Sequence, residues 1–222
     1  IFVIGNGESR LDVDIEELKT HGKVYGCNAI YRDHEVDVLV SGDHNMQHEI
    51  YTSGYALKNM CYFALWAPMP VAMYPYIMDS LKGETSRVIE NDHENSFEFV
   101  VQGHSGSKTT YVCWLAPEDM VLRVEDHFHP IEVDGVDVVS FSTGNMAVYI
   151  AAAENPAEEI TLIGFDYGSK LGEENNIYKG TKNYAADPLD DEDSIKKHEK
   201  WKFQMKYIVE HFKDNTFFGV NL

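Results

Sequence analysis

The chain opens on the feature that most constrains its fold, a short apolar run that leads directly into Gly-Asn-Gly. Residues 1–4 are apolar and partly β-branched, which is typical of a buried parallel strand. Gly5, Asn6 and Gly7 then predict a sharp turn, and Ser9 follows two residues later. In open α/β sheets, ligands bind beyond the carboxyl ends of the strands, where glycine lets backbone amides approach a phosphate. The stretch therefore predicts either a nucleotide-binding loop or a plain structural turn.

Three further predicted strands also end in polar residues. An apolar run precedes Asn28, a second precedes Asp43, and a third precedes the pair Asp166 and Tyr167. For any one strand, a solvent-exposed loop is enough to explain the polar residue without a binding site. Because the carboxyl ends of parallel strands meet at one edge of a sheet, we expect these side chains to lie close to Asn6 and to share one site.

A hydroxyl-glycine motif leads into the most apolar helix that the sequence predicts. Ser142, Thr143 and Gly144 come immediately before residues 146–153, which are rich in alanine and apolar on most helical faces. Ser142 or Thr143 can cap this helix, while the amides of its first turn are placed to hold an anion. The pattern predicts a centrally packed helix that begins at the proposed site.

The order of the predicted elements defines the fold class. A helix over residues 15–19 separates the first two strands, as in a compact βαβ unit. We predict a single Rossmann-like domain over residues 1–222, an α/β sandwich of three layers with a mostly parallel sheet. The polar stretch 84–96 predicts a surface loop, and the long polar stretch 168–193 predicts a lid loop over the site.

His198 is the main candidate for an acid–base group. It falls on the apolar stripe of a helix predicted over residues 194–213, one turn before Trp201, and residues 216–220 predict a final strand after that helix. A helix that feeds a parallel strand begins near the carboxyl ends of the strands. His198 is therefore expected to face the proposed site, although a core histidine that bonds to the backbone fits the same pattern.

Composition restricts the partners of this chain of 222 residues. Its 18 Lys and Arg residues against 37 Asp and Glu give a formal charge of −19, which repels nucleic acid and anionic membranes. A small anionic ligand stays compatible with this charge, because a few local donors outweigh distant charges. Cys27, Cys61 and Cys113 lie in apolar runs and predict buried free thiols in a reducing compartment. With no transmembrane-length apolar run and no signal peptide before the first strand, we expect a cytoplasmic protein that either lacks its initiator Met or is a fragment.

Other patterns that suggest metal or phosphate sites are weaker. The glycine-rich stretch 103–108 ends in Lys108 but lacks the spacing of a P-loop, so a hairpin loop is expected. His127 and His129 would share one face of a strand, yet spacing fixes no third ligand. The acidic run 190–193 is explained by solvation and by the start of a helix. No metal site is predicted.

Taken together, these motifs resemble those of the sialyltransferase-like superfamily. The resemblance is to bacterial sialyltransferases with one Rossmann-like domain and a lid, and to phage and environmental relatives that are related to hydroxymethylpterin diphosphokinase. It covers nearly the whole chain. The matching motifs are Gly5-Asn6-Gly7-x-Ser9, Cys27-Asn28-x-x-Tyr31, Ser142-Thr143-Gly144, Leu162-Ile163-Gly164-Phe165-Asp166-Tyr167 and the C-terminal helix with His198.

The resemblance implies a transferase that uses a nucleotide-activated donor, a nucleotide sugar for which CMP is one candidate nucleotide, with a carbohydrate as the acceptor. It implies that His198 acts as a general base and that Tyr178 and Tyr184 stabilise the departing phosphate, with no required metal. The residues implied to line the nucleotide pocket are Asn6, Gly7, Asn28, Ser142, Thr143, Gly144 and Asp166.

Two alternatives stay open. A pterin-type diphosphokinase would bind ATP and Mg²⁺ through strand-end carboxylates such as Asp43 and Asp166. A nucleotide-binding or structural protein would keep the fold without the reaction. One departure bears on the substrate, since Ser140 stands where the family's sialyltransferases carry an arginine before the hydroxyl-glycine motif. A homo-oligomer is compatible with the sequence.

Overall fold

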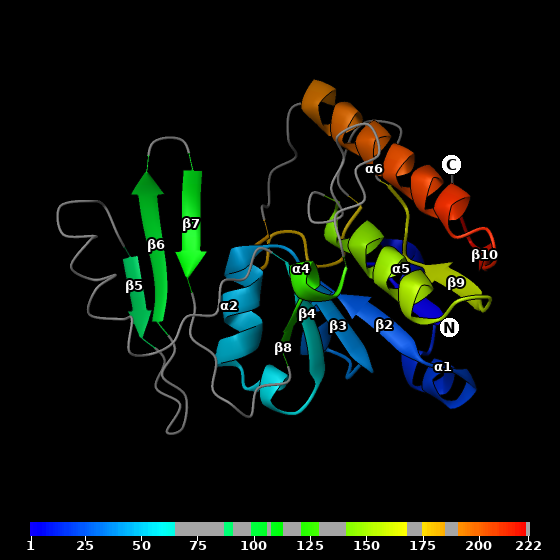
Figure 1. The fold of residues 1–222 in the computed structure, drawn as a ribbon, viewed down its shortest axis with the longest axis horizontal. Coiled ribbons are helices and arrows are strands. Elements are labelled where there is room, and N and C mark those ends of the chain that lie inside the picture. The colour runs from blue at the N-terminus through cyan, green and yellow to red at the C-terminus, as the bar shows by residue number, and fades with distance from the viewer. Residues whose placement is uncertain are drawn as a thin grey trace.

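The main sheet of the protein is parallel throughout and carries the architecture. The structure is a computed structural model that describes residues 1–64, 87–90, 99–105, 108–112, 121–128, 141–167, 175–184 and 191–220. Its 7-stranded sheet has the order β10-β9-β1-β2-β3-β4-β8 (Figure 1). The strands are β1 Phe2–Ile4, β2 Val24–Cys27, β3 Val38–Ser41, β4 Met60–Phe63, β8 Val121–Arg123, β9 Glu159–Ile163 and β10 Thr216–Phe218. The predicted α/β, Rossmann-like fold is confirmed.

The strand order reverses at β1, and this places the site. In the sheet, Val3 of β1 pairs with Tyr25 of β2 on one side and with Leu162 of β9 on the other. The chain adds β2, β3 and β4 outward on one side, then returns to add β9 and β10 on the opposite side. Loops that leave the two strands at such a switch point diverge and open a crevice at the carboxyl edge.

Helices cover both faces of the sheet, which gives the predicted three layers. On one face, Val3, Tyr25 and Val40 pack with Ile150 and Met205 in one apolar core. That face is covered by α5 Thr143–Glu154 and α6 Asp191–His211 (Figure 1). The elements that contribute to the opposite core are α1 Ile15–His21, α2 His44–Thr52 and the 3-10 helices η2 Asn28–Arg32 and η3 Tyr55–Leu57.

The central helix forms as its sequence predicts. Ser142 caps α5, because its side chain accepts a hydrogen bond from the amide of Asn145 at 3.4 Å. Residues 145–152 of α5 are all buried, since α5 lies between the sheet and α6. The N-terminal end of this helix is thereby fixed at the carboxyl edge of the sheet.

A second, smaller sheet changes one of the predicted loops. Strands β5 Arg87–Glu90, β6 Phe99–Ser105 and β7 Lys108–Val112 pair antiparallel to each other. The prediction of a surface loop over 84–96 is therefore wrong for β5, whose residues pair with β6. The remaining residues of that stretch lie outside the described residues.

One boundary at the C-terminal side also differs from the predictions. Helix α6 already begins at Asp191, so the predicted lid range 168–193 overlaps its first turn. The acidic residues there suit the positive end of a helix dipole, which explains the early start. Within the described residues, no helix is long and apolar enough to cross a lipid bilayer.

Candidate functional site

A cavity of about 580 Å³ lies at the carboxyl edge of the sheet and is lined by residues of the loops after β1 and β9. Its size is that of a site for a small organic ligand. Helices α5 and α6 supply its second wall. The residues predicted for the site that line it are Gly5, Asn6, Gly7, Asn28, Asp43, Ser142, Thr143, Gly144, Asp166, Tyr167, Tyr184 and His198. The structure brings these residues together, and their role in binding stays a prediction.

Two predicted site residues do not line the cavity. The hydroxyl of Tyr178 accepts a hydrogen bond from Arg10 at 2.6 Å and donates one to Asp33 at 2.6 Å. The single hydrogen of that hydroxyl is therefore already donated inside the protein. Ser9 is exposed, and both its amide and its hydroxyl donate to the carboxylate of Asp166. Ser9 therefore joins two loops at the rim of the site.

The Gly-Asn-Gly loop is closed by internal hydrogen bonds. The amide of Gly5 donates to Ile163 at 2.7 Å, and the amide of Gly7 donates to Gly164 at 2.9 Å. The next amide, that of Glu8, donates to the side chain of Asn175 at 2.7 Å. These amides hold the loop against β9 and the 175–184 segment, and phosphate binding at this loop stays a prediction.

The first turn of α5 does offer open donors. The amide of Ser142 donates a hydrogen bond to the side chain of Gln204 of α6 at 3.0 Å, and the amide of Asn145 donates to the capping hydroxyl of Ser142. Thr143 and Gly144 both line the cavity, and within the described residues their amides have no hydrogen-bond acceptor. A helix N-terminus with free amides and a positive dipole end favours an anion at this point.

Two tyrosine hydroxyls at the cavity stay able to donate. The hydroxyl oxygen of Tyr184 accepts a hydrogen bond from the side chain of Asn6 at 3.4 Å. Its hydrogen has no acceptor in the described part of the chain. The hydroxyl of Tyr167 is buried and has no partner there, and its backbone is held at a φ of 52°. Burial raises the pKa of both phenols above the usual value, so both are protonated donors.

Helix α6 contributes three neighbouring side chains. His198 is 7 % exposed and lines the cavity, and its ring centroid lies 5.3 Å from that of Trp201. The ammonium group of Lys197 lies 4.8 Å from the centroid of the same indole, and both residues also line the cavity. Among the described lining residues, Lys197 is the only lysine or arginine. The prediction that His198 faces the site agrees with this placement.

The side chains at the ends of β2 and β3 are held in place by local contacts. Asn28 has a φ of 52° and accepts a hydrogen bond from Ser41 at 3.1 Å. Asp43 caps α2 by accepting from the amide of Met46 at 3.1 Å. Cys27 also lines the cavity, and burial raises the pKa of its thiol to about 12, so it is not a nucleophile at neutral pH.

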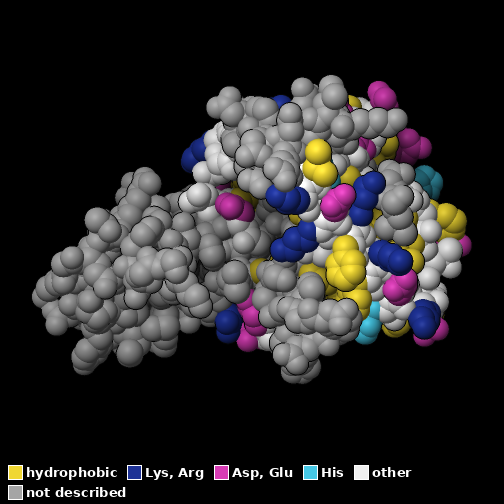
Figure 2. All heavy atoms as spheres, turned by 90° about the horizontal axis from the view of Figure 1, so that it is seen from above, with side chains coloured by type: hydrophobic (Ala, Val, Ile, Leu, Met, Phe, Trp, Pro, Cys, Tyr) yellow, Lys and Arg dark blue, Asp and Glu magenta, His cyan; other side chains and the backbone are white. Residues whose placement is uncertain are grey.

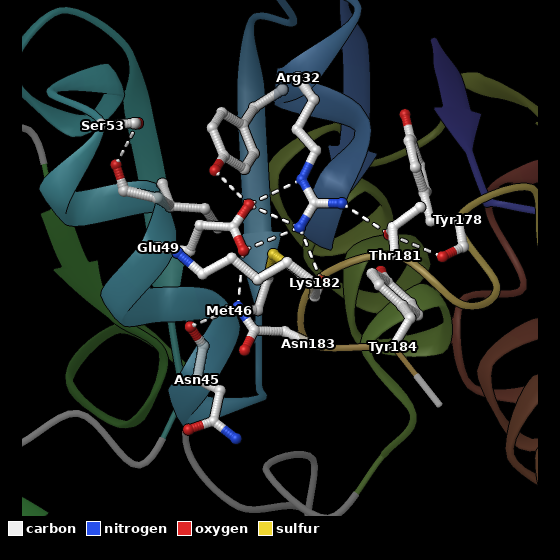
Figure 3. A network of polar contacts seen from close by, with 12 residues as sticks. Arg32, Asn45, Met46, Glu49, Ser53, Tyr178, Thr181, Lys182, Asn183 and Tyr184 are labelled. Carbon is white, nitrogen blue, oxygen red and sulfur yellow. Dashed lines mark hydrogen bonds and ion pairs between the residues drawn. The ribbon is translucent and has the colours of Figure 1, made fainter. Parts of the chain in front are cut away.

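The 175–184 segment forms the outer wall and is fastened by an ion-pair network (Figure 3). Arg32 pairs with Glu49 at 2.6 Å and also donates to Thr181 and to the carbonyl of Lys182, both at 2.8 Å. Asn183 donates to Glu49 at 2.6 Å and lines the cavity. Part of the predicted lid therefore has a fixed position against η2 and α2.

Sequence reasoning missed several residues of this site. Arg10 is 3 % exposed and supports the glycine loop, yet a lone arginine after a loop normally reads as a surface residue. Asn175, Asn176 and Asn183 line the cavity from a stretch without periodicity. Lys197 could have been found, because it is adjacent to His198 on the same helix.

The histidine pair considered for a metal is not arranged as a strand. His127 ends the short helix α4 Val124–His127, and His129 lies outside the described residues. Of the residues that the structure describes, no group of three or more His, Cys, Asp and Glu side chains could hold a metal ion.

On the face drawn in Figure 2, basic and acidic side chains are interspersed, although the net charge is −19.

Fold and cavity together define a Rossmann-like α/β protein with one ligand-sized site at its switch point. No protein-family model matches the chain, and comparisons with curated proteins and with solved structures give no match either.

Proposed function

We propose that this protein is a transferase that uses a nucleotide-activated donor, a sialyltransferase-like glycosyltransferase with His198 as its general base. The observation that carries the proposal is the shared cavity. His198 of α6, nearly fully buried, lines the same cavity as the open amides of Thr143 and Gly144. A group that can accept a proton thus lies in one site with an anion-binding helix end.

The phosphate of the donor is placed at the first turn of α5. The amides of Thr143 and Gly144 and the dipole of the 12-residue helix favour a negative group there. Lys197 of α6, which lines the same cavity, adds a positive charge. This local charge outweighs the repulsion that a chain of net charge −19 exerts on an anion at long range.

The proposed reaction follows from these positions. His198 takes the proton of the acceptor hydroxyl, whose oxygen forms a bond to the sugar carbon of the donor. The bond between that carbon and the phosphate oxygen breaks, and the negative charge moves onto the leaving nucleotide. Tyr167 and Tyr184 each have a hydroxyl hydrogen to donate to this phosphate, and Tyr178 does not.

A pterin-type diphosphokinase is the second candidate, because Asp43 and Asp166 both line the cavity. Both carboxylates already accept hydrogen bonds, Asp43 from the first turn of α2 and Asp166 from Ser9. A Mg²⁺ ion would have to share them. The third candidate is a protein that binds a nucleotide without any transfer.

Thermal-shift titration with CMP, CDP, UDP, GDP and ATP, each with and without Mg²⁺, tests the proposal. A ligand at one hundred times its Kd stabilises the folded state by about 2.7 kcal/mol, which is readily measured. We expect one of the first four nucleotides, with CMP favoured, to stabilise the protein without Mg²⁺, and the matching nucleotide sugar to be consumed with a carbohydrate acceptor. Stabilisation by ATP only with Mg²⁺ would contradict the proposal and support the diphosphokinase. Binding without transfer would support the third candidate.

A further inference from the structure

A buried arginine lies directly behind the cavity wall. The side chain of Arg10 is 2 % exposed and follows the glycine loop in the 3-10 helix η1 Glu8–Arg10. One of its terminal nitrogens donates to the carbonyl of Gly5 at 3.2 Å and to the side-chain oxygen of Asn6 at 3.0 Å. The other donates to Tyr178 at 2.6 Å and lies 4.0 Å from Asp33. Burial of a charged group is costly, so this arginine is retained for what it holds.

The contact with Asn6 fixes the orientation of its amide. Arg10 only donates, so the group that faces it must be the oxygen of the Asn6 side chain. The amide nitrogen of Asn6 then points the other way, toward the carbonyl of Cys27 at 3.2 Å and the hydroxyl of Tyr184 at 3.4 Å. A rotated amide would place its nitrogen against the arginine and lose both contacts.

The contact between Asn6 and Tyr184 in turn fixes the phenol. A hydroxyl oxygen has two acceptor positions and one hydrogen. In Tyr184 the amide nitrogen of Asn6 occupies one acceptor position of the hydroxyl oxygen. The hydrogen of Tyr184 is left for the cavity that this residue lines.

We propose that Arg10 is a positioning residue that acts through Asn6 to aim the Tyr184 hydroxyl as a hydrogen-bond donor at the phosphate of the bound nucleotide. The relay rests on the proposed function for the identity of the ligand, but the orientation of Tyr184 exists in the free protein. In this relay, the Gly-Asn-Gly loop positions Tyr184 through Asn6 and does not itself bind the phosphate.

The first experiment needs no ligand. Tyrosines labelled with ¹³C at Cζ report the hydrogen bonding of each phenol by NMR, and Tyr184→Phe assigns the signal. We expect Asn6→Ala and Arg10→Met to shift the Tyr184 signal. Arg32→Met is the matched control, because Arg32 also fastens the 175–184 segment but does not contact Asn6. A Tyr184 signal that stays unchanged in Asn6→Ala, or that shifts equally in Arg32→Met, would overturn the relay.

The second experiment uses CMP and cytidine, which differ by the phosphate. We expect Tyr184→Phe and Arg10→Met each to reduce the affinity for CMP roughly tenfold while leaving that for cytidine unchanged, because each removes the same donor to a charged group. The double variant should lose no more than either single variant, since the two residues act on one hydrogen bond. Losses that multiply would contradict the relay and show a separate structural effect.

The two experiments separate the two proposals. If neither CMP nor cytidine binds while the NMR shifts occur as expected, the relay holds and the proposed nucleotide fails. If CMP binds and Asn6→Ala leaves the Tyr184 signal and the CMP affinity unchanged, the nucleotide site holds and the relay fails. Asn6→Ala keeps the test valid if Arg10→Met does not fold.

Discussion

The backbones of Gly5 and Gly164 are in direct contact at the switch point of the sheet. A β carbon on Gly5 would collide with the carbonyl oxygen of Gly164, and Gly164 itself has a φ of 76°. The same carbonyl accepts the amide of Gly7 at 2.9 Å. The loops after β1 and β9 are therefore sealed to each other, and this seal forms the floor of the cavity.

Substitution of Gly5 tests the seal. Gly5→Ala should lower the free energy of unfolding by about 2 kcal/mol or more, because the colliding atom is a backbone carbonyl that cannot rotate away. Gly42→Ala is the matched control, since its β carbon would lie 3.4 Å from the side chains of Met146 and Thr143. Urea titration of both variants measures the difference. Equal stabilities would show that the contact is not rigid.

Two tyrosines should separate stability from binding. Tyr178→Phe removes a hydroxyl that is bonded to both Arg10 and Asp33, and should cost roughly 1–2 kcal/mol of folding stability. Tyr167→Phe removes a buried hydroxyl without a described partner, so it should leave stability unchanged or raise it while weakening nucleotide binding.

Thermal unfolding with and without CMP measures both effects. A Tyr167→Phe variant that is clearly destabilised, with unchanged affinity for CMP, would show that this hydroxyl serves the fold.

The network around Glu49 predicts a dependence of stability on pH. Burial raises the pKa of Glu49, but hydrogen bonds from Tyr31 and Arg32 outweigh it and lower the net pKa below the usual value. A lowered pKa in the folded state gives stability that is present above the unfolded pKa of about 4.3 and lost as the pH falls through the folded value.

Wild type should therefore lose its advantage over Glu49→Gln on acidification below about pH 4.3. Urea midpoints at pH 7 and across the acid range measure this. Parallel curves for the two proteins would contradict the predicted lowering of the pKa.

The charge of Lys197 should strengthen binding of the nucleotide phosphate and leave binding of the nucleoside unchanged. Lys197→Met is expected to weaken CMP binding by roughly tenfold and to reduce its salt dependence, with cytidine binding unchanged. Lys200→Met on the same helix is the control, because Lys200 is exposed and does not line the cavity. Isothermal titration at two salt concentrations measures both variants. Equal losses in the two variants would indicate a general field effect.

The sequence predicted the parts of the fold that rest on periodicity and on turn chemistry. The apolar run 1–4, the helix that follows Ser142 and the inward side of His198 each depend on local patterns, which the structure repeats. The sheet order was implied only as far as parallel strands with a shared edge. Strand β8 was not predicted.

The parts of the site that were missed depend on contacts between distant segments. Arg10 meets Tyr178 across 168 positions of sequence, and the amide of Gly7 finds its acceptor beyond β9. Such pairings have no local signature, so the sequence left the glycine loop as either a nucleotide-binding loop or a plain turn, and the role of Tyr178 came only from the resemblance. The same tertiary contacts left Thr143, Gly144 and Tyr184 as the available donors.

The most direct test of the proposed function is the turnover of His198→Ala compared with its nucleotide affinity. The variant is assayed for release of the nucleotide from a nucleotide sugar in the presence of a carbohydrate acceptor, and its affinity for the free nucleotide is measured by titration. If His198 is the general base, turnover falls by at least about a hundredfold while nucleotide affinity stays close to that of wild type. Turnover equal to that of wild type would contradict the assigned role of His198.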